Sequence, residues 1–396
     1  MRGGKKIIGE QKNRPAVALK NILRHSLIYS AGNFFNKTVA FLLVPFYTHY
    51  LVPAEYGTLS LIEITSYIIE MFLAAGISQS IMRFYHEQES VAEKKLLVSS
   101  SLITSAAFSF FGLIPFMFLT DFMSAVIFES TRYSVLLKIM LATLFFSMTS
   151  EVSLTYLRIK EKSLEYNVAV ILRTLLSLTL NIVFVAVFRW GVSGILISSL
   201  ISIALNGIVL NWLTTREIGF GFSLPHVFEM LKYGLPYIPS GLGMFVINFS
   251  DRYFLQRLSS LEELGVYSLG FKFGMIFQFL IFEPFMLIWG PKRFEVARQD
   301  NGSRVITRVF TYFCFIQIFA GLSLCLVIKD VMSLVASPAY QQAYRIVPWI
   351  VLSYFLLSIY FHIQIGILLK KKTKIIALII GAAVGIKILL SIILIP

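Results

Sequence analysis

Charged residues are scarce in this sequence, and their scarcity excludes an ordinary soluble globular protein. Only 14% of the 396 residues are charged, and 57% are hydrophobic. Soluble domains usually contain about 25% charged residues. Acidic residues are fewer than basic ones, with 21 Asp and Glu against 35 Lys and Arg. The composition therefore points to a membrane protein with an excess of basic residues.

Disulfide pairs and enzyme signatures are also missing. The two cysteines, Cys314 and Cys325, lie on one expected helix, about 16 Å apart at 1.5 Å per residue, so they cannot bond to each other. The chain has no zinc-protease, nucleophile-elbow or Walker sequence. We therefore expect no enzymatic activity, no cofactor and no metal. Without an ATP site, energy would come from an ion gradient or the substrate gradient.

Long apolar runs dominate what is present. A helix needs about 20 mostly apolar residues to cross about 30 Å of hydrocarbon, and lipid requires the backbone to bond internally. These runs lack the alternation of apolar and polar residues that is typical of the strands of membrane β-barrels. The sequence predicts eleven membrane-spanning helices at 27–47, 57–82, 97–119, 134–157, 166–188, 191–213, 231–251, 264–290, 309–328, 345–369 and 374–395.

The basic residues occupy every second loop, which predicts the topology. Of the 35 Lys and Arg, 24 lie in one alternate set of loops, six in the other set and five inside the spans. Cytoplasmic loops retain Lys and Arg, so we expect a cytoplasmic N-terminus with residues 1–26 as a basic cytoplasmic tail. The net charge of +14 then reflects loops beside anionic lipid, and we expect no nucleic-acid partner.

An internal repeat relates the two halves of the chain. Residues 23–87 align without a gap with 231–295 at an offset of 208, and each copy contains a Glu-x-Gly turn, Glu55–Gly57 and Glu263–Gly265. Six spans separate the copies, so both begin inside. This predicts a parallel repeat about an axis along the membrane normal.

The repeat also predicts two lobes. The N-terminal lobe would comprise six helices over 27–213, and the C-terminal lobe 214–396 has only five visible spans. We expect this second lobe to be incomplete.

Several short motifs resemble a known family. Their order and spacing, together with the pattern of spans, resemble polysaccharide-biosynthesis membrane proteins, the oligosaccharide flippases of the multidrug/oligosaccharidyl-lipid/polysaccharide exporter superfamily. The motifs are LKN (Leu19–Asn21), PFYTHYL (Pro45–Leu51), PAEYG (Pro53–Gly57), GISQSIMRFY (Gly76–Tyr85), NFSDRYFL (Asn248–Leu255) and EELGVYS (Glu262–Ser268).

The resemblance implies a MATE-like fold. This would be an all-α polytopic membrane protein in which two pseudo-symmetric helix bundles, in the shape of a V, surround a central cavity. It also implies transfer of a lipid-linked oligosaccharide, on a polyprenyl diphosphate, across the cytoplasmic (inner) membrane. Membrane lipid, a polysaccharide polymerase and glycosyltransferases are the other expected partners. Relatives have twelve to fourteen spans, so this chain is shorter than the family pattern.

Polar side chains within the spans are the candidate site. Charge in hydrocarbon is unfavourable by about 2.5–3.5 kcal/mol on insertion scales, so these residues should face a wet cavity or one another. Glu63, Ser66, Tyr67 and Glu70, for example, share one helix face. The cavity candidates are Lys37, Arg173, Lys272, Glu63, Glu70, Glu151, Asn33 and Asn181.

These residues admit two interpretations. In one, the cations Lys37, Arg173 and Lys272 neutralise a diphosphate, and the glutamates govern protonation-linked or ion-linked switching. In the other, they form interhelical ion pairs, for instance Glu63 or Glu70 with Lys37.

Gate and hinge candidates lie near the ends of spans. Arg83 flanks the inner mouth, where its alternative role is positive-inside anchoring. Asp251 and Arg252 come at the outer end of the seventh span, where the alternative is an outer-surface or helix-end ion pair. Pro236 and Pro239 make the seventh span a candidate hinge, because proline removes a backbone donor and permits a kink.

Three other functions remain open at this point. A drug/cation antiporter of the same superfamily would favour an acidic cavity. A polysaccharide polymerase or glycosyltransferase would need a catalytic loop or an acidic cluster, and the outer loops are short. A structural membrane protein would not need stripes of buried charge.

Overall fold

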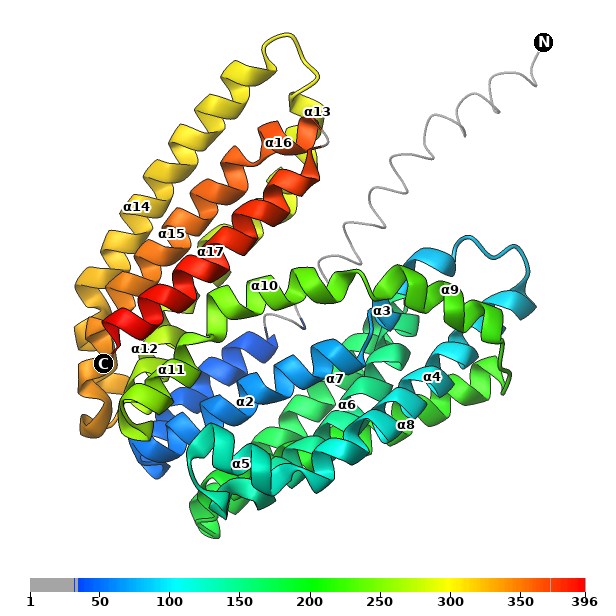
Figure 1. The fold of residues 1–396 in the computed structure, drawn as a ribbon, viewed down its shortest axis with the longest axis horizontal. Coiled ribbons are helices and arrows are strands. Elements are labelled where there is room, and N and C mark those ends of the chain that lie inside the picture. The colour runs from blue at the N-terminus through cyan, green and yellow to red at the C-terminus, as the bar shows by residue number, and fades with distance from the viewer. Residues whose placement is uncertain (1–31, 33–34, 371, 396) are drawn as a thin grey trace, which may run out of the picture. The chain divides into compact units, whose positions relative to one another are not determined.

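The computed structural model describes residue 32 and residues 35–370 and 372–395, and all the regular elements among them are helices (Figure 1). They form two compact units. The first unit holds the described residues up to Leu43 with Ile69–Phe122 and Arg132–Ile238. The second holds Val44–Ile68, Met123–Thr131 and the described residues from Pro239 onward. These units divide the chain differently from the expected lobes, 27–213 and 214–396, which stay a prediction.

The first unit is built mainly from long antiparallel helices. Its helices, including the π-helical turn η2, are α3 (Ile77–Phe84), α4 (Val91–Phe118), α6 (Ser134–Ile159), α7 (Ser163–Asn181), η2 (Ile182–Val187), α8 (Gly191–Ile218) and α9 (Leu224–Gly234).

Small polar residues allow these helices to pack closely. Helix α6 packs against both α4 and α8, and α7 packs against α8. The buried face of α4 carries Ser101, Ser105 and Ser109, and the Ser105 hydroxyl donates to the Met148 carbonyl of α6 at 3.1 Å. The hydrophobic effect does not favour association between helices in lipid. Close packing of small side chains and interhelical hydrogen bonds of this kind stabilise the association instead.

The second unit contains helices from both copies of the internal repeat. Residues 35–50 form a helix that enters this unit at Val44. The other elements, of which α2, α5 and α10 extend beyond the unit, are α2 (Pro53–Leu73), α5 (Thr120–Phe128), α10 (Tyr237–Phe249), α11 (Asp251–Leu258), α12 (Leu261–Phe277), η3 (Gln278–Phe282), α13 (Glu283–Val296), α14 (Gly302–Val335), η4 (Pro338–Arg345), α15 (Val347–Ile363), α16 (Ile365–Leu369) and α17 (Thr373–Leu394). Helix α15 packs against α12 and α14, and the short helix η1 (Thr131–Tyr133) precedes α6.

The helices confirm an all-α polytopic membrane fold. Eight described helices are long and apolar enough to cross a membrane, and a ninth span results if α2 and α3, bent by 47°, are counted together. The expected span 27–47 lies partly outside the described residues. The expected span 231–251 is not one continuous helix, because α9 ends at Gly234 and α10 begins at Tyr237. Pro236 lies in that break, and Pro239 lies in the first turn of α10, where a missing N–H is tolerated.

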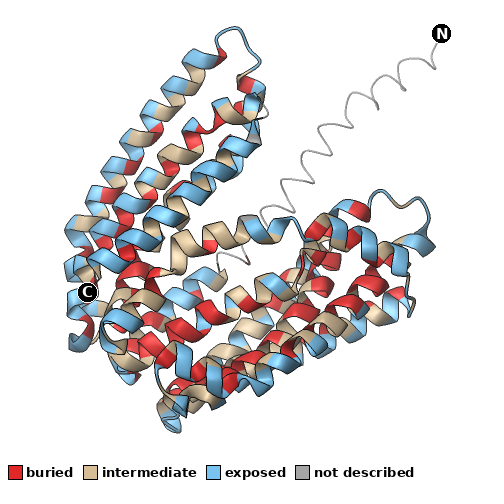
Figure 2. Cartoon of the chain, in the orientation of Figure 1, coloured by how far each residue is buried: buried red, intermediate tan, exposed pale blue. Residues whose placement is uncertain are grey.

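Large apolar side chains cover much of the outer surface. Phe315, Phe319 and Leu326 of α14 and Leu378 and Leu394 of α17 are all more than two thirds exposed (Figure 2). Such continuous apolar surface would be unfavourable in water. It fits a lipid environment, in which these side chains remain in hydrocarbon.

The internal repeat appears in the second unit as reciprocal contacts. A Cβ atom on Gly57 would lie 2.2 Å from the Leu261 carbonyl oxygen, and one on Gly265 would lie 1.9 Å from the Pro53 carbonyl oxygen. Ser60 and Ser268, 208 residues apart, join across the same crossing by a hydrogen bond of 2.9 Å. The two glycine contacts are equivalent under the repeat, because Gly57 corresponds to Gly265 and Pro53 corresponds to Leu261. A local two-fold axis requires this equivalence. The glycines of the two Glu-x-Gly turns are therefore the point where α2 and α12 cross.

The glutamates of the two Glu-x-Gly motifs lie in the first turns of the same two helices. Glu55 accepts a hydrogen bond from the Val52 backbone N–H at 3.1 Å, just before α2. Glu263 accepts one from the Ser259 hydroxyl, just before α12, at 2.5 Å. Carboxylates are stabilising in the first turn of a helix because unpaired N–H groups point toward them. The Glu-x-Gly pattern thus combines a helix start with a close helix crossing.

Candidate functional site

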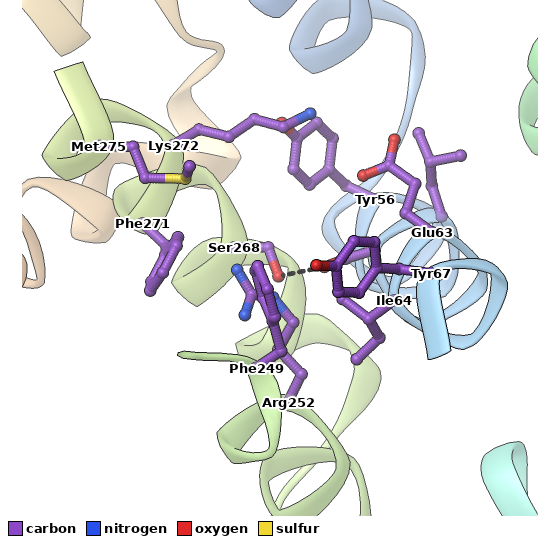
Figure 3. A pocket seen from close by; sticks show the side chains of 12 residues that line it. Tyr56, Glu63, Ile64, Tyr67, Phe249, Arg252, Ser268, Phe271, Lys272 and Met275 are labelled. Atoms are coloured by element: carbon purple, nitrogen blue, oxygen red, sulfur yellow. Dashed lines mark hydrogen bonds between the residues drawn. The ribbon is translucent and has the colours of Figure 1, made fainter. Parts of the chain in front are cut away.

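A cavity of about 280 Å³ lies within the second unit, between α2, α10, α11 and α12 (Figure 3). Its size is near the lower limit of small-molecule sites. The walls combine aromatic and aliphatic side chains with two cations and one carboxylate. The lining residues are Tyr56, Leu59, Ser60, Glu63, Ile64, Tyr67, Phe249, Arg252, Ser268, Phe271, Lys272 and Met275.

Helix α2 presents one polar face to this cavity. Tyr56, Ser60, Glu63 and Tyr67 follow one another at helical spacing, so one side of the helix carries all four. Glu63 and Tyr67 belong to the stripe predicted from the sequence. Tyr56 and Ser60 were not predicted, although they extend the same stripe by two turns. The hydropathy pattern misses them because both are close to the helix start, where polar residues are common.

Lys272 reaches the cavity from α12. Its ammonium lies 5.2 Å from the centre of the Tyr56 ring, and Tyr56 is only 2% exposed. Tyr56 and Glu63 are both close enough to interact electrostatically with this ammonium. The predicted cavity residues Lys272 and Glu63 are therefore brought together here, and the positive charge of Lys272 is partly compensated.

Asp251 and Arg252 are buried, which does not fit an ion pair on the outer surface. Each is 5% exposed, and only Arg252 borders the cavity. They are the first two residues of α11, which packs against α12. The helix-end pair and the gate role stay predictions.

The guanidinium of Arg252 lies among aromatic rings. It is 4.3 Å from the Phe271 ring centre and 5.2 Å from that of Phe249. Nη1 donates to the Asn248 carbonyl at 3.4 Å. Flat guanidinium groups pack favourably on aromatic faces while keeping their edge N–H groups for oxygen acceptors.

The first unit contains the other group of predicted charges. Glu70, Glu151 and Arg173 are half-buried on α2, α6 and α7, and Glu151 is close enough to both of the others for electrostatic interaction. Arg158, in the last turn of α6, donates to Glu151 at 2.5 Å and to Thr155 at 2.8 Å. For Glu151, this pairing favours the structural interpretation.

Lys37 and Asn181 are not among the residues that line the cavity just described. Lys37 is exposed, and Asn33 lies outside the described residues. Asn181 is buried and donates to the Ser177 carbonyl of its own helix at 2.8 Å. Their expected roles in a substrate cavity stay predictions.

Arg83 contacts an aromatic side chain of α9. Its guanidinium lies 4.7 Å from the Tyr233 ring centre and 3.4 Å from Glu87. The Tyr233 hydroxyl in turn lies 3.1 Å from that of Tyr237, across the break between α9 and α10. The gate role of Arg83 and the hinge role of the break stay predictions. Among the described residues, no three His, Cys, Asp or Glu side chains are grouped as metal ligands would be.

Comparison with solved structures shows the fold. The chain is similar to an inward-facing multidrug resistance MATE family transporter of the MOP superfamily, with a TM-score of 0.62 and 17% identity over 83% of this chain and 80% of that chain. It is also similar to a MATE transporter from Vibrio cholerae, with a TM-score of 0.58 and 14% identity over 87% and 82% of the two chains.

A third similar structure comes from Pyrococcus furiosus. It is a MOP superfamily transporter described as having a binding pocket of reverse polarity that suggests a different function. The TM-score is 0.55, with 16% identity over 94% of this chain and 88% of that chain.

Comparison by sequence shows the family. No curated protein matches the chain. The model of the polysaccharide biosynthesis protein family matches residues 22–292, which is more than half of the chain and includes the first copy of the repeat and most of the second. With this match and the MATE-type fold, the chain belongs to the polysaccharide biosynthesis protein family.

Proposed function

We propose that this protein is a flippase that moves a polyprenyl-diphosphate-linked oligosaccharide across the cytoplasmic membrane by alternating access. The observation that carries the proposal is a cavity with two cations among the membrane helices of a polysaccharide biosynthesis family member. The product would serve a surface polysaccharide such as the O-antigen of lipopolysaccharide.

The charges of the cavity favour an anionic substrate. Lys272 and Arg252 border it, and Glu63 is its one carboxylate. Coulomb energy varies inversely with the dielectric constant, so a cation within a membrane helix attracts a diphosphate more strongly than an exposed one. A lipid-linked diphosphate needs this compensation, because its charge is otherwise unfavourable inside the bilayer.

The same charges argue against a cation/drug antiporter. A cationic drug entering this cavity would meet two positive side chains and one negative one. A polymerase or glycosyltransferase is also less favoured, since the cavity has a single carboxylate and the described residues contain no cluster of metal ligands. Polymerase and glycosyltransferase partners would instead act before and after translocation.

Surface glycan in a complemented deletion strain tests this function. We expect Lys272→Ala to reduce export at normal membrane abundance, and Lys272→Arg to retain part of it because the charge remains. Lys138→Ala is the matched control, since Lys138 is an exposed lysine of a spanning helix that does not border the cavity. Full export by Lys272→Ala, or an equal loss in Lys138→Ala, would contradict the proposed role of the cavity.

A further inference from the structure

Asp251 and Arg252 are neighbours in a buried site, yet they are poorly paired. Their closest charged atoms, Arg252 Nη1 and Asp251 Oδ1, are 3.8 Å apart, which exceeds hydrogen-bond distance. Both side chains are about 95% buried, and Asp251 Oδ1 has no hydrogen-bond partner among the described residues. The other carboxylate oxygen, Oδ2, is bonded to a different group.

That group is the hydroxyl of Tyr267, which donates to Asp251 Oδ2. Tyr267 lies on α12, and Asp251 is the first residue of α11. Asp251 does not border the cavity. The hydrogen bond thus joins α11 to α12 and fixes one oxygen of a carboxylate that is not part of the cavity lining.

Arg252 is left with little compensation on the cavity side. Its Nε is buried and has no hydrogen-bond partner among the described residues. Apart from the Asn248 carbonyl and the Asp251 carboxylate at 3.8 Å, its contacts are with aromatic rings. Lys272 differs, because Tyr56 and Glu63 lie close to its ammonium. Of the two cations bordering the cavity, Arg252 has the greater unused capacity for an oxygen anion.

We propose that Tyr267 is a positioning residue that keeps Asp251 from hydrogen-bonding directly to Arg252, so that Arg252 binds the phosphate or diphosphate group of a ligand in this cavity. The guanidinium fork fits phosphate oxygens through two N–H groups. Only the identification of that ligand as a lipid-linked diphosphate rests on the proposed function. The anion site itself follows from the arrangement of Tyr267, Asp251 and Arg252.

Removal of the Tyr267 hydroxyl gives a directional test. In Tyr267→Phe, Asp251 is free to turn toward Arg252, and the resulting ion pair competes with the ligand. We expect the affinity for farnesyl diphosphate to fall about tenfold, in line with the loss of one charge-assisted hydrogen bond. In the double variant Tyr267→Phe/Asp251→Asn no competing carboxylate exists, so binding should return to near the wild-type level. Arg252→Gln should abolish it.

The measurement is titration calorimetry on the purified full chain in lipid nanodiscs, with farnesyl diphosphate, inorganic pyrophosphate and farnesol as probes. Tyr253→Phe is the matched control, because it removes another phenol hydroxyl, bonded to Thr65 at 2.9 Å, that does not border the cavity. Thermal unfolding midpoints identify any variant that fails to fold. If Arg252→Gln does so, Arg252→Lys replaces it, with weakened rather than abolished binding expected.

Each outcome decides a separate point. Failure of the double variant to recover, or an equal loss in Tyr253→Phe, would overturn the positioning role of Tyr267. No binding of either phosphate probe by the wild type, or full binding by Arg252→Gln, would overturn the anion site. Equal affinity for pyrophosphate and farnesyl diphosphate would support the anion site with a free anion as ligand. Glycan export is measured independently, so the flippase function can fail while this binding series succeeds.

Discussion

An added methyl group at the crossing of α2 and α12 should open the second unit at its most closely packed point. The Cβ atom of Gly265→Ala would lie 1.9 Å from the Pro53 carbonyl oxygen and 2.6 Å from the Pro53 carbonyl carbon. These are main-chain atoms, which cannot rotate away as a flexible side chain can. The two helices must therefore separate, and the Ser60–Ser268 hydrogen bond beside the contact must lengthen.

The expected loss of stability can be estimated from two opposing effects. Overpacking a close contact destabilises by about 1–3 kcal/mol. Replacing a helical glycine by alanine recovers up to about 1 kcal/mol through backbone propensity. We expect a net loss of about 1–2 kcal/mol for Gly265→Ala, because the obstruction here is backbone. This corresponds to a fall of about 2–8 °C in the thermal midpoint, on the scale of domains of 150–250 residues.

The reciprocal variant Gly57→Ala should behave in the same way, since its Cβ would lie 2.2 Å from the Leu261 carbonyl oxygen. Because one separation of the helices relieves both clashes, the double variant should lose less than the sum of the two. Gly290→Ala and Gly381→Ala are matched controls, as nothing lies within 4 Å of either added Cβ. Fluorescence-detected unfolding in detergent measures all of these. An unchanged midpoint for Gly265→Ala would refute the close crossing.

Three further predictions concern topology, the first unit and its packing. In a cysteine-free background, Thr131→Cys should react with an impermeant thiol reagent added outside and Lys160→Cys should not, because these exposed residues flank one spanning helix; the reverse labelling would overturn the orientation. Arg173→Ala should abolish surface glycan at normal membrane abundance, with partial recovery in Arg173→Lys, which keeps the charge but lacks the fork; unchanged export would show that this half-buried cation is structural or idle. Gly234→Ala should destabilise the protein by about 1–3 kcal/mol in thermal unfolding, since its Cβ would lie 2.1 Å from the Ala75 carbonyl oxygen, and a wild-type midpoint would disprove that contact.

Hydropathy was sufficient to predict the fold class. A run of about 20 apolar residues crosses a bilayer as a helix whatever surrounds it, because the backbone must satisfy itself. The all-α membrane fold and the family resemblance are accordingly confirmed. Breaks within spans were less predictable. The bend between α2 and α3 occurs where Ala75 and Gly76 adopt φ angles of 46° and 67°, which apolar composition does not reveal.

The candidate site was predicted only in part. Lys272 and Glu63 were predicted as cavity residues and Arg252 as a gate residue, and all three border one cavity. Tyr56 has no such signal, since a buried tyrosine in a spanning helix is ordinary. Tyr267 was also missed, because its importance depends on a hydrogen bond to Asp251 from another helix.

The sequence by itself determined the properties that depend on neighbouring residues: the class, the spans, the repeat and the set of intramembrane charges. Helical periodicity and transfer into lipid act within about 20 residues, so both can be followed along the chain. Only the tertiary structure decided which charges meet. It placed Glu63 with Lys272, and it bonded Asp251 to Tyr267. Those pairings depend on how separate helices cross and rotate, and the crossing of α2 and α12 is set by glycine contacts between residues more than 200 positions apart.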